Sequence, residues 1–270
     1  MNETQSQKQK PPLKVSVIVP NFNRAELLPE TLDNILGQSL PPYELIVVDD
    51  RSTDNFAEVK ERYKDRVIFV VNKGRGPGAG RNTGFEISTG EYVKYFDSDD
   101  VMTVNSLEAQ AGLLNKTGQP MVYGPYVHVT KDADNRWKQA GAILQYKGIP
   151  DAMPLRRCMV RGFFTAIAAM TFRRDFMQDI GPWRTDIFAY EDWDLLWRIG
   201  RTLIQPLHNS ETAMFYRMHG AQITGSQVAN QTRNFDRVAC FTDALNSLNP
   251  ATDGTNNWDK QVMKAQIWRT

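Results

Sequence analysis

Residues 92–100 read YVKYFDSDD, an apolar run that ends in three carboxylates. The first five residues suit a buried β-strand, and Asp97, Asp99 and Asp100 crowd its C-terminal end. Like charges this close repel one another, and Mg²⁺ or Mn²⁺ would relieve the repulsion because both cations prefer carboxylate oxygens. A solvated turn explains the same residues, because aspartate is common in turns. The stretch alone therefore leaves a metal site and a turn as alternatives.

Polar residues also follow the neighbouring predicted strands. Apolar runs that predict further strands precede this stretch at residues 14–19, 43–48 and 67–71. Helical spacing between them gives a β-α-β-α-β order, which is typical of a doubly wound α/β sheet. The polar residues that follow the first two runs are Asn21, Asn23, Arg24, Asp49 and Asp50. Because ligands bind at the carboxyl ends of the strands in such sheets, these polar groups predict one binding edge.

A glycine-rich loop, NKGRGPGAG at residues 72–80, lies just before the strand. Its spacing fits neither the dinucleotide pattern G-x-G-x-x-G nor a P-loop, so a Rossmann dehydrogenase and a P-loop NTPase are disfavoured. Glycine lets the backbone approach a ligand closely, and a helix start favours anions. A flexible surface turn is the alternative for residues 74–78. Arg81 and Asn82 open the helix predicted over residues 81–88 and should face the binding edge.

Length and composition exclude several classes of protein. The chain has 270 residues, which suits one large α/β domain or two small ones. Its net charge of +1 gives no basic field for nucleic acid. Cys158 and Cys240 match no paired zinc spacing and predict free buried thiols. Residues 1–12 are polar, and no apolar run approaches the ~20 residues of a transmembrane span. We therefore expect a soluble, cytoplasmic protein with a disordered leader at residues 1–12.

Beyond residue 100 the pattern is less regular. The expected elements are a helix at 107–114, strands at 121–129 and 165–172, helices at 174–180 and from about 192, and short strands at 203–207 and 212–218. Residues 131–153 mix turn residues with short apolar pieces and predict a hairpin or a loop. The tail after Gly225 has the spacing of an amphipathic helix.

Five segments occur in the order and spacing of family 2 glycosyltransferases: VSVIVPNFNR, ELIVVDDRSTD, GRNTGFEISTGEYVKYFDSDD, YEDWDLLWRI and YRMHGAQIT. The chain resembles that family over about residues 13–225. The resemblance implies an α/β GT-A fold, a Rossmann-like, mostly parallel central sheet flanked by helices. Residues 226–270 lie outside the resemblance and are expected to form a C-terminal helical extension. The resemblance also implies a nucleotide-sugar-binding half at 13–105 and an acceptor and catalytic half at 106–225. The expected reaction is inverting transfer from a nucleotide-diphosphate sugar with Mg²⁺ or Mn²⁺.

The resemblance assigns donor and metal contacts to individual residues. Those that would contact the nucleotide or the donor are Pro20, Asn21, Asn23, Arg24, Asp49, Asp50, Arg81, Asp97 and Ser98. Of the two acids after the second strand, Asp50 is slightly favoured as the contact to the base or the ribose. Asp99 and His219 would hold the metal that bridges the two phosphates. Asp100 could share these tasks or cap the next turn.

The sequence EDWD at residues 191–194 opens a predicted helix and contains the candidate catalytic base. An inverting transfer needs one carboxylate that takes the proton of the attacking hydroxyl. The resemblance gives this role to Asp192, and the start of a helix favours the ionised form that a base requires. Asp194 is expected to pair with Arg198 at i, i+4 spacing. The candidates for contacts to the acceptor or the diphosphate are Trp183, Glu191 and Arg217. A place in the core is the alternative for Trp183, and a structural role is the alternative for Glu191.

Two other functions fit parts of the sequence. DSDDV at residues 97–101 matches the nucleophile loop of haloacid-dehalogenase-like phosphatases, but three predicted strands precede it and EDWD would be unexplained. An inactive sugar-nucleotide-binding module is the second, and the intact acids argue against it. For a transferase of polysaccharide biosynthesis we expect a UDP-sugar donor and a glycan or lipid-linked acceptor. The extension could pack on the domain, form a homodimer or contact the inner face of a membrane.

Overall fold

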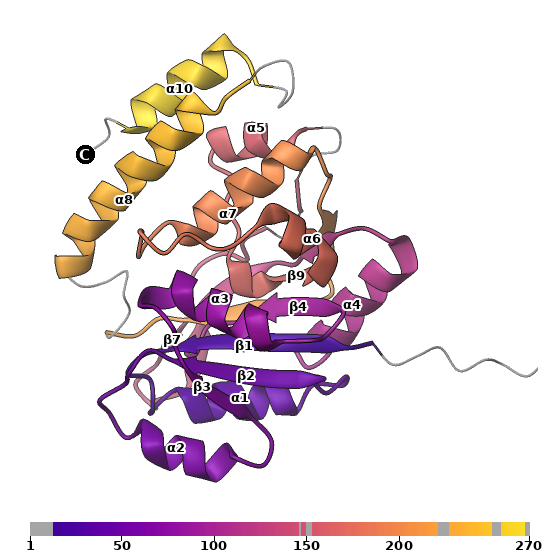
Figure 1. Ribbon diagram of the computed structural model, residues 1–270, viewed down its shortest axis with the longest axis vertical. Helices are drawn as coiled ribbons and strands as arrows, with labels where there is room; N and C mark the ends of the chain where they lie inside the picture. Colours follow the sequence, from indigo (N-terminus) through magenta and orange to yellow (C-terminus); the bar gives the residue numbers. More distant parts are fainter. Residues whose placement is uncertain (1–12, 146, 150–152, 221–226, 250–254, 268–270) are drawn as a thin grey trace, which may run out of the picture.

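The computed structural model describes residues 13–145, 147–149, 153–220, 227–249 and 255–267, so the predicted leader lies outside the described residues (Figure 1). A seven-stranded sheet runs through the molecule in the order β10-β6-β9-β4-β1-β2-β3. Its strands are β1 (Val15–Asn21), β2 (Glu44–Asp49), β3 (Ile68–Val71), β4 (Tyr92–Tyr95), β6 (Met121–Tyr123), β9 (Met170–Arg173) and β10 (Leu207–His208). The first four are parallel, whereas β9 is antiparallel to β4 and β6. The predicted mostly parallel α/β sheet is confirmed.

Helices cover both faces of this sheet, as parallel strands require. Along β1, Val17 and Val19 point to one face and Ile18 to the other, because successive side chains of a strand alternate. The helices on the first face are α1 (Leu28–Leu36), α2 (Phe56–Tyr63) and α4 (Ser106–Thr117). Those on the second face are α3 (Gly76–Ile87), α5 (Leu155–Val160), α6 (Arg174–Ile180) and α7 (Glu191–Ile199). Each face therefore has its own hydrophobic core.

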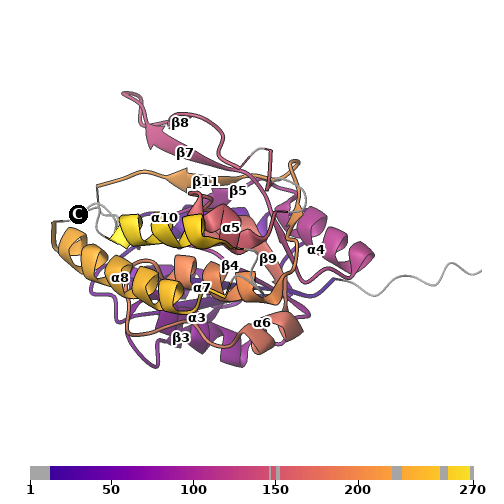
Figure 2. The same cartoon turned by 90° about the horizontal axis from the view of Figure 1, so that it is seen from above.

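A second, four-stranded sheet lies beside the carboxyl end of β4. It has the order β5-β11-β7-β8 and consists of β5 (Val101–Met102), β11 (Met214–Arg217), β7 (Tyr126–Lys131) and β8 (Trp137–Gln139). The prediction of one strand at residues 121–129 is wrong, because Gly124 and Pro125 divide it between the two sheets. Proline lacks the N–H that a continuous ladder needs. The β7–β8 hairpin, predicted as a hairpin or loop, projects from the edge of the molecule (Figure 2).

The C-terminal extension packs on the helices that cover the second face of the main sheet. Its helices are α8 (Gln227–Asn246) and α10 (Asn257–Ile267), which lie side by side across α5 and α7 (Figures 1 and 2). Phe241, Leu248 and Met263 enter the same core as Trp193 and Trp197 of α7. The extension is thus part of the domain's core. In the described part of the chain, no helix has the length and apolarity to span a bilayer.

Glycines of α3 are packing positions. The helix begins at Gly76, inside the glycine-rich loop, and not at Arg81 as predicted. A Cβ placed on Gly78 would lie 2.2 Å from the carbonyl oxygen of Arg184, so the loop before α7 rests directly on this helix. A Cβ on Gly84 would lie 2.4 Å from Cγ2 of Ile18 in β1. The alternative of a flexible surface turn is therefore wrong for Gly78.

We expect Gly84→Ala to destabilise the protein, because the new methyl group collides with a β-branched side chain in a central strand. Overpacking of this kind costs about 1–3 kcal/mol. Gly112 is the matched control, since it also lies inside a helix (α4) but its Cβ would come no closer than 4.0 Å to Leu13. Gly112→Ala should be neutral or stabilise by up to about 1 kcal/mol. Urea unfolding of both variants measures the difference, and equal midpoints would contradict the packing role of Gly84.

Candidate active site

The acid loop (residues 97–100) lies at the carboxyl end of β4, where distant parts of the chain meet. Oδ2 of Asp99 lies 2.9 Å from Nε of Arg24 and 3.0 Å from Nε2 of His219. Arg24 follows β1, and His219 follows β11. Burial alone would raise the pKa of Asp99, but hydrogen bonds from His219 and Arg24 hold it below its ordinary value. Asp99 is therefore a carboxylate at neutral pH.

The Asp99–His219 pair fits a divalent cation that a diphosphate helps to hold. Mg²⁺ usually binds through one or two carboxylates together with substrate phosphates and water, and imidazole suits transition metals. Among the residues that the structure describes, no group of three or more His, Cys, Asp or Glu side chains is arranged to hold a cation. If Asp99 and His219 bound the cation, its remaining coordination positions would be open to the substrate and water. A cation on Oδ2 of Asp99 would compete there with Arg24.

Arg81 joins the acid loop to the start of α7. Its guanidinium is buried, with Nη2 3.0 Å from Oδ1 of Asp97 and Nη1 2.7 Å from Oε1 of Glu191. Its Cζ lies 4.5 Å from the ring centroid of Trp183. Burial raises the pKa of Asp97 and Asp99 adds to this, although Arg81 opposes both. The predicted nucleotide contact of Arg81 would require these ion pairs to open, whereas Glu191 has the structural role of holding Arg81.

Asp192 lies in the first turn of α7, where Tyr190 supplies a left-handed residue before the helix. Its Oδ1 accepts a hydrogen bond from the backbone N–H of Trp193 at 2.7 Å. Burial, followed by the charge of Glu191, raises the pKa of Asp192 to about 7, with Arg81 opposing. The expectation that the helix start keeps this carboxyl ionised is corrected, since burial and a neighbouring acid outweigh the helix. A carboxyl with this pKa can accept and release a proton near neutral pH.

The loops after β1 and β2 interlock at the donor edge. The carboxylate of Asp49 accepts hydrogen bonds from Nδ2 of Asn21 at 3.1 Å and from Oγ of Ser52 at 2.6 Å. Asn23, with φ +52°, accepts from the backbone N–H of Thr53. Asp49 is thus committed to the loop itself. Its neighbour Asp50 accepts from the N–H of Gly76 at 2.7 Å and faces the start of α3.

Three further residues of the predicted binding edge are Pro20, Asn82 and Ser98. Pro20 would lie 3.1 Å from a Cβ placed on Gly80, so β1 and α3 meet closely there. Ser98 is buried, and its carbonyl accepts a hydrogen bond from Thr31 of α1. Asn82 exchanges hydrogen bonds with the backbone of Trp183 at 2.9 and 2.8 Å. These three residues brace the site's backbone.

The predicted phosphate contact of Arg217 is corrected by its burial. Its side chain has no exposed surface and pairs with Glu30 and with the carbonyl of Asp99. Its backbone N–H donates to Oδ1 of Asp100 at 2.9 Å, so Asp100 holds β11 to the acid loop and does not cap the next turn. Burial, with Asp99 and Asp97 adding, raises the pKa of Asp100 well above its ordinary value. Arg217 is therefore a structural tie between β11, α1 and the acid loop.

Of the two roles open to Trp183, an acceptor contact and a place in the core, the structure shows the core. The ring is 3% exposed and meets Tyr95 edge-on, with centroids 5.0 Å apart. An indole enclosed in this way has no free face for a sugar. The prediction that Asp194 pairs with Arg198 is confirmed, with Nε and Oδ2 2.9 Å apart.

Tyr126 is one further residue near the site, and it was not predicted from the sequence. Burial raises the pKa of Tyr126, and the charge of Asp192 adds to this effect, so this tyrosine of β7 lies within electrostatic range of the proposed base. It carries no motif, and its place depends on the break between β6 and β7. Because the break between β6 and β7 was not predicted, the position of Tyr126 was not predicted either.

Carboxylates at the carboxyl edge of a mostly parallel sheet, close to an acid on a separate helix, define a glycosyltransferase of the GT-A fold. A family model described as glycosyl transferase family 2 matches residues 16–181. The chain belongs to this family, and its membership argues against the phosphatase alternative.

Curated relatives match parts of the chain. A poly(ribitol-phosphate) beta-glucosyltransferase of Bacillus spizizenii is 39% identical over 103 residues, 35% of this chain and 16% of that protein. The poly(ribitol-phosphate) beta-N-acetylglucosaminyltransferase TarP of Staphylococcus aureus is 38% identical over 119 residues, 42% of this chain and 36% of that protein. These alignments span well under half of either relative.

Solved structures match nearly the whole chain in fold. S. aureus TarS 1-349 in complex with UDP-GlcNAc gives a TM-score of 0.69 at 20% identity, covering 94% of this chain and 72% of that one. The mannosyltransferase PcManGT from Pyrobaculum calidifontis, in complex with GDP-Man and Mn²⁺, gives 0.62 at 20% identity and covers 94% and 73%. The expected GT-A fold is confirmed.

Proposed function

We propose that this enzyme transfers a sugar from a nucleotide-diphosphate sugar to a hydroxyl group of an acceptor, with inversion and with a divalent cation. One observation carries the proposal. Arg81 ties Asp97 of the acid loop to Glu191, the residue directly before Asp192. The donor edge and the proposed base are therefore held together by a buried ion-pair bridge.

Asp192 acts as the general base in this proposal. It takes the proton of the acceptor hydroxyl while the oxygen attacks the anomeric carbon from the face opposite the leaving group. The new C–O bond forms as the bond between the sugar and the phosphate oxygen breaks, and its electron pair leaves with the nucleoside diphosphate. A cation held by Asp99 and His219 would neutralise charge on that leaving group. Arg81 fixes Glu191, and hence the first turn of α7, relative to the acid loop.

The named relatives support a choice of donor. TarS was solved with UDP-GlcNAc, and the two curated relatives transfer glucose and N-acetylglucosamine to poly(ribitol phosphate) according to their names. We therefore propose a UDP-sugar donor and a polyhydroxylated polymer as acceptor, in polysaccharide biosynthesis. The cytoplasmic location, contact with a membrane, the domain boundary at residue 225 and a homodimer through the extension remain predictions.

A panel of donors tests the proposal, and we expect UDP-sugars with Mn²⁺ to be used. The purified chain is incubated with UDP-GlcNAc, UDP-glucose or GDP-mannose, with Mn²⁺ or with EDTA, and release of nucleoside diphosphate is measured. Slow hydrolysis of one UDP-sugar, abolished by EDTA, is the expected result, because water can replace an absent acceptor. UDP binding without any release would instead support the inactive binding module.

A further inference from the structure

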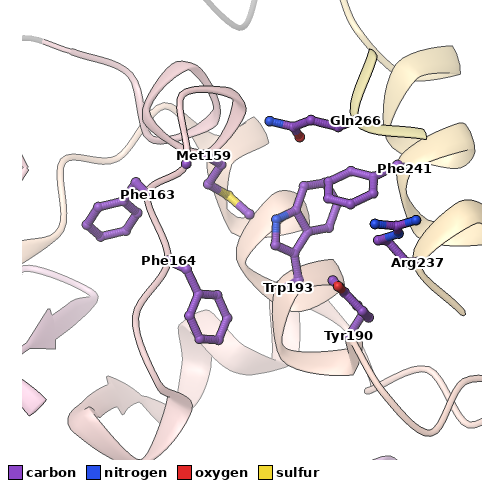
Figure 3. A pocket seen from close by; sticks show the side chains of 9 residues that line it. Met159, Phe163, Phe164, Tyr190, Trp193, Arg237, Phe241 and Gln266 are labelled. Atoms are coloured by element: carbon purple, nitrogen blue, oxygen red, sulfur yellow. The ribbon is translucent and has the colours of Figure 1, made fainter. Parts of the chain in front are cut away.

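A pocket lies between the C-terminal extension and the start of α7 (Figure 3). Its volume is about 270 Å³, and aromatic side chains dominate its lining: Phe163, Phe164, Tyr190, Trp193 and Phe241. The ring centroids of Trp193 and Phe241 are 4.4 Å apart, and those of Tyr190 and Phe241 are 6.1 Å apart, so α8 is packed firmly against α7. The wall is therefore a fixed aromatic surface.

Arg237 of α8 brings a positive charge to this pocket (Figure 3). Its Nε and Nη2 are buried, and neither has a hydrogen-bond partner within the described residues. Among the described residues, no acidic side chain lines the pocket, and the adjacent Asp236 accepts hydrogen bonds from the backbone of Phe188 and Ala189 instead. Buried guanidinium nitrogens without partners are costly, and an anion that accepts two hydrogen bonds would satisfy both Nε and Nη2 of Arg237. The pocket thus has the charge and donors for an anion.

The pocket adjoins the proposed base through two of its own lining residues. Tyr190 and Trp193 lie on either side of Glu191 and Asp192 in the sequence, so the pocket wall and the base share one helical turn. Gln266 of α10 donates its amide to the carbonyl of Val160 at 3.0 Å, which leaves Oε1 to accept a hydrogen bond from a hydroxyl. Pockets for complete drug-sized ligands begin at roughly 300 Å³. This one suits a single sugar or polyol unit.

We propose that this pocket binds one anionic unit of the acceptor, a sugar or polyol that carries a phosphate or a carboxylate. Arg237 pairs with the anionic group, and the aromatic rings contact the carbon face of the unit. A hydroxyl of the neighbouring unit is then directed toward Asp192. The inference rests on the proposed transferase function and adds the chemical class of its acceptor. It also makes the extension, which lies outside the region that matches the family model, part of substrate recognition.

Arg237→Met tests the proposal, because it removes the charge and keeps the length of the side chain. The control is Arg201→Met, which removes an exposed arginine elsewhere on the surface. Calorimetry with UDP and Mn²⁺ in excess, to fill the donor site, measures binding of glucose 6-phosphate, galacturonic acid, glucose and inorganic phosphate. We expect the wild type and the control to bind at least one of the two anionic sugars and to bind glucose much more weakly. Arg237→Met should weaken that binding at least tenfold.

The choice between the two anionic sugars identifies the anionic group of the acceptor. Equal affinity of Arg237→Met and wild type for both sugars would overturn the proposal, as would inorganic phosphate binding as tightly as the sugar phosphate, because the aromatic wall would then contribute nothing. Donor hydrolysis by the wild type, measured without an acceptor, tests the transferase function separately from the pocket. A protein that binds the anionic sugar through Arg237 but hydrolyses no donor refutes the transferase and retains the pocket.

Discussion

Asp192→Asn should reduce sugar transfer by about 10²–10⁴-fold, the range that general acid–base catalysis contributes. Asparagine has nearly the shape of aspartate and retains the Oδ1 that accepts from the N–H of Trp193, so the helix start should persist. It cannot take a proton from the acceptor. Affinity for UDP and Mn²⁺ should stay within a few-fold of wild type, because the donor contacts lie on the acid loop. Initial rates of transfer and calorimetric titration with UDP measure the two effects.

The pH profile of the wild type separates this role from a structural one. The pKa of Asp192 is raised to about 7, so the active carboxylate form is lost as the pH falls below that value. kcat/KM should therefore fall tenfold per pH unit below about pH 7 and level off above it, and the residual rate of Asp192→Asn should lack this step. Asp194→Asn is the matched control on the same helix, since Asp194 pairs with Arg198, and it should keep both rate and profile. Full turnover in Asp192→Asn would exclude Asp192 as the base.

Asp99→Asn should reduce the rate of transfer at least about 10²-fold, because the metal contributes several kcal/mol of charge stabilisation in such reactions. Unlike the change at Asp192, this substitution should also remove the effect of Mn²⁺ on UDP affinity. The neutral amide no longer attracts the cation, whereas His219 alone binds it weakly. Calorimetric titration with UDP in the presence of Mn²⁺ and of EDTA measures the loss directly.

Asp100→Asn is the control in the same loop. Asp100 is buried, and its Oδ1 accepts from the backbone of Arg217, a contact that asparagine can keep. Mn²⁺ should still strengthen UDP binding in this variant. If Mn²⁺ had the same effect in Asp99→Asn as in wild type, the metal assignment would be refuted.

The first half of the fold was predictable because its signals are local. Each of the parallel strands from β1 to β4 is a short apolar run, and the turn residues between the elements are close in sequence. The division of residues 121–129 between two sheets was not predictable by hydrophobic pattern, since both pieces are apolar and buried. Only the Gly-Pro pair hinted at it.

Site residues were predictable where family motifs mark them. They were not predictable where burial decides whether a side chain contacts the substrate or packs in the core. Asp99 and His219 meet as the resemblance implied. Arg217 stands in the same motif as His219, but an arginine bound for the core looks no different in sequence from one that meets phosphate. Arg237 was not predicted, because a lone arginine on an amphipathic helix is normally interpreted as solvent-exposed. In the structure its Nε and Nη2 are buried.

The Arg217 tie has a consequence for how the enzyme folds. The hydrogen bond from Arg217 to Asp100 joins residues 117 positions apart in the sequence, and the contact of His219 with Asp99 joins residues 120 positions apart. Contacts of such high order form late, because the chain must first pay the entropy of closing a long loop. The sheet from β1 to β4 can thus be assembled before any functional site exists. Recovery of metal-dependent UDP binding during refolding should lag behind the recovery of helical structure.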